Sequence, residues 1–107
     1  MNTIKRTYEI LTNNNLVENK KTFSVDWANR NENWFAHLVS TERECGLEAL
    51  INILIKAQTQ RDKFQQRRNT FGFIVDEYIE ALSEVIDIIT DYLGSKYKIK
   101  SVELLAA

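Results

Sequence analysis

The chain contains no proline, only three glycines and a single cysteine among its 107 residues. Because proline and glycine interrupt regular helices, their scarcity favours long helical segments. The turn pairs Asn-Gly and Asp-Gly, which close tight β-hairpins, are also missing. One cysteine cannot form a disulfide within the chain, and this is typical of proteins of the reducing cytoplasm.

Long apolar runs are missing as well. No segment approaches the roughly 20 apolar residues that a membrane-spanning helix needs, and the first 15 residues lack the apolar region of a signal peptide. We therefore expect a cytoplasmic protein with no membrane partner. The apolar fraction of 44% indicates a packed core, and the length suits one domain, or a small domain with an extension.

Charge is distributed unevenly along the chain, although the net charge is only −1. Residues 1–70 carry 11 basic and 8 acidic side chains, whereas residues 71–107 carry 3 basic and 7 acidic ones. The positive potential therefore lies with the first two thirds of the chain, where it favours a contact with an anionic partner. The near-neutral total is unfavourable for a nucleic-acid-binding protein as a whole.

Patterns that carry catalysis or bind metals are absent from the sequence. His37 is the only histidine, and neither Glu44 nor Cys45 stands at a recognised ligand spacing from it. Cys45 also lacks the base that a nucleophile needs, and no two glycines lie close enough to form a phosphate-binding loop. The carboxylates between positions 76 and 91 fit a solvated helix face. We expect no enzyme activity, no metal and no cofactor.

The first 45 residues predict three short helices separated by asparagine-rich loops. Ile4, Tyr8 and Leu11 lie on one face of the first helix, which three consecutive asparagines end. Thr22 or Ser24 is expected to cap the second helix. The three helices are expected over residues 3–17, 24–28 and 32–41.

The third helix has an apolar and a polar side. At 100° per residue, Phe35, Leu38 and Val39 share the side that faces the core, and Trp34 lies at its border. Asn33, His37 and Ser40 fall on the opposite side, flanked by Arg30 and Thr41. These outward residues are the ones expected to meet a partner.

Residues 24–54 show a series of helix, turn and loop features in an order that is typical of one family of proteins. A polar cap opens a helix, an apolar–Ala pair packs it, and a turn leads into a second helix; a polar loop and a leucine-rich helix follow. These features are Ser24, Trp27-Ala28, the turn 29–31, residues 34–41, the loop 41–45 and residues 46–54. In this order the segment resembles the Cro/CI-like (XRE-type) helix-turn-helix family of bacteria and phages. It departs from the family in two ways: the turn has no glycine, so Asn29 or Asn31 must supply any left-handed residue, and Trp34 is bulkier than the usual Ser or Thr.

The resemblance implies a sequence-specific transcriptional regulator that binds double-stranded DNA, with the helix at 32–41 in the major groove. The base contacts would come from Asn33, His37, Ser40 and Thr41, and Asn31 in the turn is a further expected DNA-binding residue. The phosphate contacts would come from Lys20, Lys21, Arg30 and Arg43.

Residues 47–94 form one strongly periodic region. Starting at Leu47, we take positions that are alternately three and four residues apart. Twelve of the fourteen are apolar, which is typical of helix–helix packing. The segment 69–72 is its only weak point; the half before it is basic and the half after it is acidic. Folding back near residue 70 would place Lys56 near Glu84, Arg61 near Glu80 and Lys63 near Glu77. An antiparallel dimer of two long helices would have the same pairing.

The last helix is more apolar than one packing partner requires, and the excess face predicts either contact with a second subunit or deep packing on the head. The expected dimer-interface residues are Tyr78, Leu82, Val85, Ile86, Ile89 and Leu93. A stop is expected at Gly94. The residues after it predict either a short strand or docked tail, or a disordered segment.

We therefore expect an all-α protein: a helix-turn-helix head (1–55), a long helical hairpin that dimerises it (56–94) and a tail (95–107). The function expected is that of a bacterial or phage DNA-binding regulator acting as a homodimer. The alternative is a small protein-binding adaptor or phage-encoded inhibitor that uses its acidic C-terminal helix on a host protein.

Overall fold

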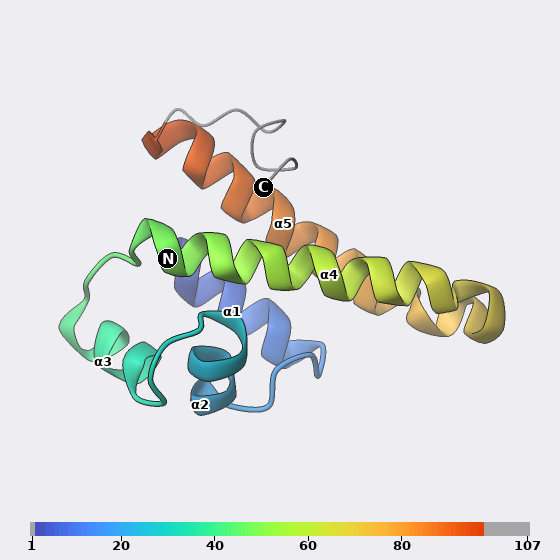
Figure 1. The fold of residues 1–107 in the computed structure, drawn as a ribbon, viewed down its shortest axis with the longest axis horizontal. Helices are drawn as coiled ribbons and strands as arrows, with labels where there is room; N and C mark the ends of the chain where they lie inside the picture. The colour runs from blue at the N-terminus through green and yellow to red at the C-terminus, as the bar shows by residue number, and fades with distance from the viewer. Residues whose placement is uncertain (1, 98–107) are drawn as a thin grey trace.

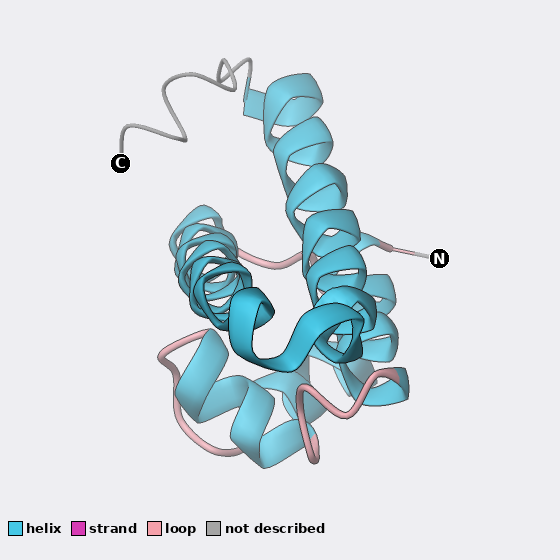
Figure 2. Ribbon diagram, turned by 90° about the vertical axis from the view of Figure 1, so that its right-hand side faces the viewer, coloured by secondary structure: helices cyan, strands magenta, loops and turns pink. Residues whose placement is uncertain are grey.

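The computed structural model describes residues 2–97, which form helices joined by short loops (Figure 1). Figure 2 shows no strand in this range, so the predicted all-α fold is confirmed. The elements are, in order, α1 (Thr3–Asn13), α2 (Lys20–Thr22), the π-helical turn η1 (Phe23–Trp27), α3 (Trp34–Thr41), α4 (Leu47–Phe71), the 3₁₀ turn η2 (Gly72–Val75) and α5 (Asp76–Tyr97).

The two long helices, α4 and α5, run in opposite directions from the turn at η2 and separate toward their other ends (Figure 1). Gly72 ends α4 with a φ of 59°, a backbone conformation that residues with a Cβ rarely adopt. Near the turn, the ring of Phe64 stacks on that of Tyr78, with 5.0 Å between the ring centroids. The chain thus folds back on itself close to the expected position and does not continue as one long helix.

The ion pairs that the sequence predicted between the long helices are not formed. Within residues 2–97, Lys56, Arg61 and Lys63 have no carboxylate partner on α5. Glu84 pairs instead with Arg6 of α1, whose Nη2 lies 3.5 Å from the carboxylate oxygen. Exposed ion pairs contribute only about 0–1 kcal/mol each, so apolar packing outweighs them in setting which residues of the two helices meet.

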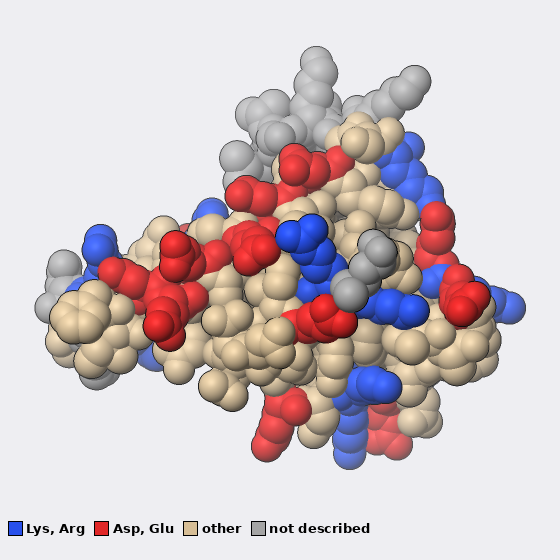
Figure 3. Space-filling view, turned by 180° about the vertical axis from the view of Figure 1, so that it is seen from behind, with Lys and Arg blue, Asp and Glu red and all other residues tan. Residues whose placement is uncertain are grey.

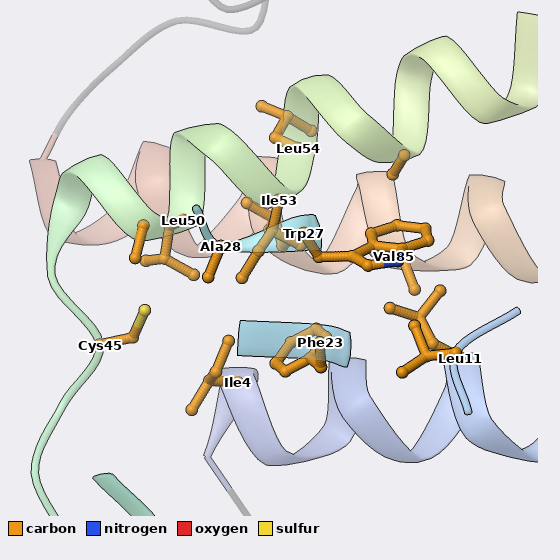
Figure 4. Packing of buried hydrophobic residues seen from close by; sticks show 14 of the residues in the cluster. Ile4, Leu11, Phe23, Trp27, Ala28, Cys45, Leu50, Ile53, Leu54 and Val85 are labelled. Carbon is orange, nitrogen blue, oxygen red and sulfur yellow. The ribbon is translucent and has the colours of Figure 1, made fainter. Parts of the chain in front are cut away.

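One hydrophobic cluster joins side chains from both ends of the chain (Figure 4). The ranges predicted as head and extension both contribute to it. Its largest fully buried members are Leu11, Phe23, Phe35, Leu50, Ile53, Leu54, Leu82, Val85, Ile89 and Leu93. Burial of an aliphatic or aromatic side chain contributes about 1.5–3 kcal/mol, so this cluster is the main source of stability.

The face of α5 that the sequence assigned to a dimer interface lies inside the chain. Its aliphatic members are all 5% exposed or less: Leu82, Val85, Ile86, Ile89 and Leu93. Tyr78 is half-buried and stacks on Phe64. Helix α1 packs against α5, so α5 has two packing partners, α1 and α4. This face of α5 is covered without a second subunit, and these five side chains have no area left for one.

Asparagine caps move the helix boundaries away from the expected ones. Asn2 caps α1, since its Oδ1 accepts a hydrogen bond from the Lys5 N–H at 2.9 Å. Asn19 accepts from the N–H of Thr22 at 2.9 Å, so the second helix begins at Lys20 instead of residue 24. Helix α1 ends at residue 13, four residues early, and α3 begins at residue 34, two residues late.

Toward the other end of the chain, α5 passes through Gly94 without stopping and is described as far as Tyr97. The remainder of the predicted tail, residues 98–107, lies outside the described residues. Within the described range, no helix combines the length and apolarity needed to span a bilayer.

Candidate functional site

Ser24 joins α3 to the helical segment that precedes it. Its hydroxyl is fully buried, donates a hydrogen bond to the Lys20 carbonyl at 2.8 Å and accepts one from the N–H of Phe35 at 3.0 Å. Both bonds offset the cost of removing these polar groups from water. The sequence had offered Ser24 only as a helix cap, and its hydrogen bond with Phe35 of α3 was not foreseen. This hydrogen bond fixes where α3 begins relative to η1.

The turn between η1 and α3 is built by asparagines. The N–H of Ala28 donates to the carbonyl five residues earlier at 3.0 Å, which is the hydrogen bond of a π-helix. Asn29 follows with a φ of 57°, as expected for a turn without glycine. The Asn31 side chain accepts from the N–H of Asn33 at 3.0 Å. From α4, Asn52 donates to the Ala28 carbonyl at 3.0 Å and anchors the turn to the long helix.

Aromatic side chains hold the inner side of α3 against the body of the protein. The ring centroid of Phe35 lies 4.7 Å from that of Tyr8 in α1 and 5.0 Å from that of Phe23. Leu38 is buried beside it and Val39 is half-buried. Aromatic pairs at such separations contribute about 0.5–1.5 kcal/mol beyond their buried area. The inner side of α3 is therefore the one predicted from its periodicity.

The outer side of α3 is exposed and polar. Asn33, His37, Ser40 and Thr41 are all exposed. The hydroxyls of Ser40 and Thr41 donate to the His37 carbonyl at 3.0 and 2.8 Å, which leaves their oxygens able to accept further hydrogen bonds. These four side chains form the outer face of α3, with Asn31 exposed in the turn before it.

Basic side chains flank this outer face, and two of them pair with acidic neighbours. The Nη2 of Arg30 lies 3.5 Å from a carboxylate oxygen of Glu48, and the Nζ of Lys21 lies 3.4 Å from one of Glu32. The sequence had not indicated the pairing with Glu48. Both pairs are exposed, so a competing anion can displace their carboxylates at little cost. The four basic residues of the region are Lys20, Lys21, Arg30 and Arg43, and all are exposed.

A second polar surface lies along α5. Figure 3 shows acidic side chains gathered on this face. A groove of about 460 Å³ lies there, and Asn14 at the end of α1 forms part of its wall. The acidic residues that line the groove are Glu77, Glu80, Glu84 and Asp87.

Cys45 lies just before α4 and is only 6% exposed. Burial raises the pKa of its thiol to about 12, and the charge of Arg30 opposes this rise only in part. Because the thiolate is the reactive form, a thiol that stays protonated at neutral pH is a poor nucleophile and a poor metal ligand. Between residues 2 and 97, no three His, Cys, Asp or Glu side chains are grouped in a way that would hold a metal ion.

A family model, that of a family of unknown function (DUF6626), matches residues 4–91 of the chain. The matched range starts in α1 and ends inside α5, so it includes the turn, α3 and most of the helices that build the core. No curated protein and no solved structure matches the chain.

Proposed function

The chain belongs to the DUF6626 family, whose function is unknown, and we propose that it is a sequence-specific regulator that binds double-stranded DNA through α3. The observation that carries this proposal is the hydrogen bond from the Phe35 N–H to Ser24, which holds α3 on the preceding helix with its polar side outward. DNA-binding helix-turn-helix proteins insert an exposed second helix of this kind into the major groove. The resemblance of residues 24–54 to Cro/CI-like proteins supports the same function.

In this proposal the outer face of α3 contacts the edges of bases. An asparagine side chain matches the donor and acceptor of adenine, so Asn33 at the start of the helix suits an A·T pair, as does Asn31 in the turn. His37 adds a ring N–H donor one turn further along. Ser40 and Thr41 offer the oxygens that their internal hydrogen bonds leave free.

The phosphate contacts come from Lys20, Lys21, Arg30 and Arg43 at the edges of that face. Arg30 and Lys21 exchange their carboxylate partners for phosphates when DNA binds, which costs little because both pairs are exposed. Four acidic residues lie in the same stretch, namely Asp26, Glu32, Glu42 and Glu44. The electrostatic attraction of this region to DNA of any sequence is therefore weak. The affinity for the target site depends instead on the base contacts and on two copies of the protein binding together.

The proposed regulator acts as a homodimer, but the two copies contact each other through residues other than those expected from the sequence. The aliphatic residues of the α5 face are buried in the core, so a second copy must bind elsewhere. Among the described residues, Phe73 and Ile74 at the α4–α5 turn are the most exposed large apolar side chains, at 82% and 66%. A palindromic target site would indicate that two copies bind together.

The test is a selection from random-sequence duplexes with the purified full chain, repeated over a series of salt concentrations. We expect one short sequence to be enriched. The double variant Arg30→Ala/Arg43→Ala should bind it more weakly, and the slope of log K against log salt should fall by about 2, since each lost phosphate contact removes about 0.9.

A matched control removes the same charge elsewhere. Lys63→Ala/Arg67→Ala takes two exposed cations from α4, beyond the core end of the helix, and should leave affinity and slope unchanged. Two results would show that α3 is not the DNA-binding surface. One is a selection that enriches no sequence; the other is equal binding by the Arg30→Ala/Arg43→Ala variant and the wild type.

A second candidate function, binding of a basic segment of another protein, is favoured by the acidic groove on α5. The groove concentrates four carboxylates within a narrow range of the helix, and only Glu84 among them has a cationic partner within the described part of the chain. In this function the protein is an adaptor or inhibitor, and α3 serves only to complete the core.

A further inference from the structure

The turn between α4 and α5 carries two adjacent apolar side chains that the core does not cover. Phe73 is 82% exposed and Ile74 is 66% exposed, whereas Val75, the next residue, is buried. Figure 1 shows this turn projecting beyond the other described helices, at the opposite end of the molecule from α3. Adjacent exposed apolar side chains are typical of a surface that binds a partner. A partner bound there would leave α3 uncovered.

Contacts within the hairpin hold the turn in a fixed shape. The Phe64 ring stacks on that of Tyr78. The Arg68 guanidinium donates two hydrogen bonds to the Asp76 carboxylate, from Nε at 2.9 Å and from Nη2 at 3.3 Å. Because these contacts already order the turn, a partner that binds it has little conformational entropy to remove.

An open groove of about 500 Å³ lies between α4 and α5, on the core side of the turn. We call it the turn groove; its walls are formed by Gln65, Arg68, Asp76, Ile79, Glu80 and Ser83. Ile79 is half-buried and offers an apolar surface, and Arg68 and Asp76 neutralise each other. The groove can therefore accept an uncharged apolar side chain. It starts next to the exposed pair, since Asp76 follows Ile74 by two residues.

We propose that Phe73 and Ile74 bind in the turn groove of a second copy of the chain, and that this contact forms twice around a two-fold axis. Each copy carries both the apolar pair and the groove, so one symmetric arrangement fills both grooves at once. Because the groove lies nearer the core than the pair does, the two hairpins must run antiparallel and overlap at their ends. The inference rests on the proposed function only for the expectation of a homodimer, and it supplies the contact.

The available area favours a symmetric pair over a one-sided contact. An aromatic side chain buries roughly 150–250 Å², so Phe73 and its neighbour together fall well below the about 800 Å² that each partner buries in a standard interface. Two-fold repetition doubles the apolar contact and adds the walls of both grooves. The interface remains small even so, and we expect a weak dimer with a dissociation constant in the micromolar range.

The charges near the turn give no attraction to an anionic membrane, the other surface that binds exposed apolar side chains. Residues 63–80 contain three cations and three carboxylates, namely Lys63, Arg67, Arg68, Asp76, Glu77 and Glu80. Their charges sum to zero, whereas segments that bind anionic lipids carry an excess of basic residues. A contact between apolar side chains and the turn groove requires no such excess.

The experiment is sedimentation velocity of the purified full chain without DNA, over concentrations from micromolar to submillimolar. We expect the mass to rise from one chain to two. Phe73→Ser/Ile74→Ser, which removes the apolar pair, should weaken the dimer by at least about tenfold. Ser83→Trp, which fills the turn groove and leaves the pair intact, should do the same.

The matched control is Val25→Ser/Ile55→Ser, which removes two other large apolar side chains, at 43% and 42% exposure, and should leave the dimer unchanged. Circular dichroism confirms that each variant is folded. A second arm measures binding to phosphatidylcholine vesicles that contain phosphatidylserine, and we expect none.

Four results would overturn the proposal. They are a wild-type chain that stays monomeric, a dimer unaffected by Phe73→Ser/Ile74→Ser, a dimer unaffected by Ser83→Trp, and vesicle binding that the Phe73→Ser/Ile74→Ser variant loses. The readout is separate from that for α3. A monomer that still enriches one DNA sequence would overturn this contact alone, and a dimer that enriches none would overturn only the DNA-binding function.

Discussion

Two residues with a hydroxyl group, Thr7 and Ser24, are fully buried among those that the structure describes, and their surroundings differ. The hydroxyl of Ser24 both donates and accepts a hydrogen bond. The Oγ1 of Thr7 in α1 has no partner among the described residues. A buried polar atom without a partner loses its bonds to water and gains none in exchange, whereas a fully paired one holds two segments together. Ser24 therefore stabilises the fold and Thr7 costs stability.

The substitution Ser24→Ala should lower the free energy of unfolding by about 1–3 kcal/mol, because it leaves the Phe35 N–H buried and unpaired. Urea denaturation followed by circular dichroism measures this change. Thr7→Val, which removes a hydroxyl of similar size and burial, is the matched control and should leave the stability unchanged or raise it. Equal losses in the two variants would show that the Ser24 hydrogen bonds do not hold α3 in place.

The pair of long helices depends on how the chain reverses between them. Gly72 has φ 59° and ψ −140°, a combination that side chains with a Cβ avoid on steric grounds. A Cβ placed there would meet no atom within 4 Å, so the space is open and only the backbone is restrictive. Gly46, which precedes α4, has an extended backbone with φ −68° and equally open surroundings. The two glycines thus differ in conformation alone.

We expect Gly72→Ala to lower the free energy of unfolding by about 1–3 kcal/mol through backbone strain. Gly46→Ala should be neutral, or stabilising by about 0.4–1 kcal/mol, because its backbone already suits alanine and the unfolded chain becomes stiffer. Thermal and urea unfolding of both variants provide the comparison. A Gly72→Ala variant as stable as Gly46→Ala would mean that the turn adopts another conformation at little cost.

At the scale of the whole molecule, charge is separated between two surfaces. The cations near α3 belong to α2 and to the loops before and after α3, whereas the carboxylates of the groove belong to α5. The core joins α1, α4 and α5 beneath them, so neither surface is needed to hold the helices together. Either surface is therefore available for a partner, and the two can be changed independently.

The candidate role of the acidic groove is tested by neutralising it. Glu80→Gln/Asp87→Asn should weaken binding of a synthetic lysine-rich peptide, measured by fluorescence anisotropy, and the wild-type affinity should fall with salt as screened attraction requires. The control Glu18→Gln/Asp62→Asn removes two exposed carboxylates outside the groove and should have no effect. If both variants bind the peptide as the wild type does, the groove is not the binding surface.

Local features of the sequence determined much of this protein. The scarcity of proline and glycine led to helices, the periodicity of α3 separated its inner and outer sides, and the glycine-free turn required a left-handed residue such as Asn29. Each of these features depends on residues within a few positions of one another, where steric and hydrogen-bonding preferences act directly.

Tertiary packing decided the rest. The apolar face of α5 meets α1 and not a second subunit, because periodicity indicates that a face is buried but not what covers it. Glu84 pairs with Arg6 instead of Lys56, because weak exposed charges follow the packing of apolar side chains. Ser24 holds α3 because folding brings its hydroxyl to the N–H of Phe35, 11 residues further along the chain.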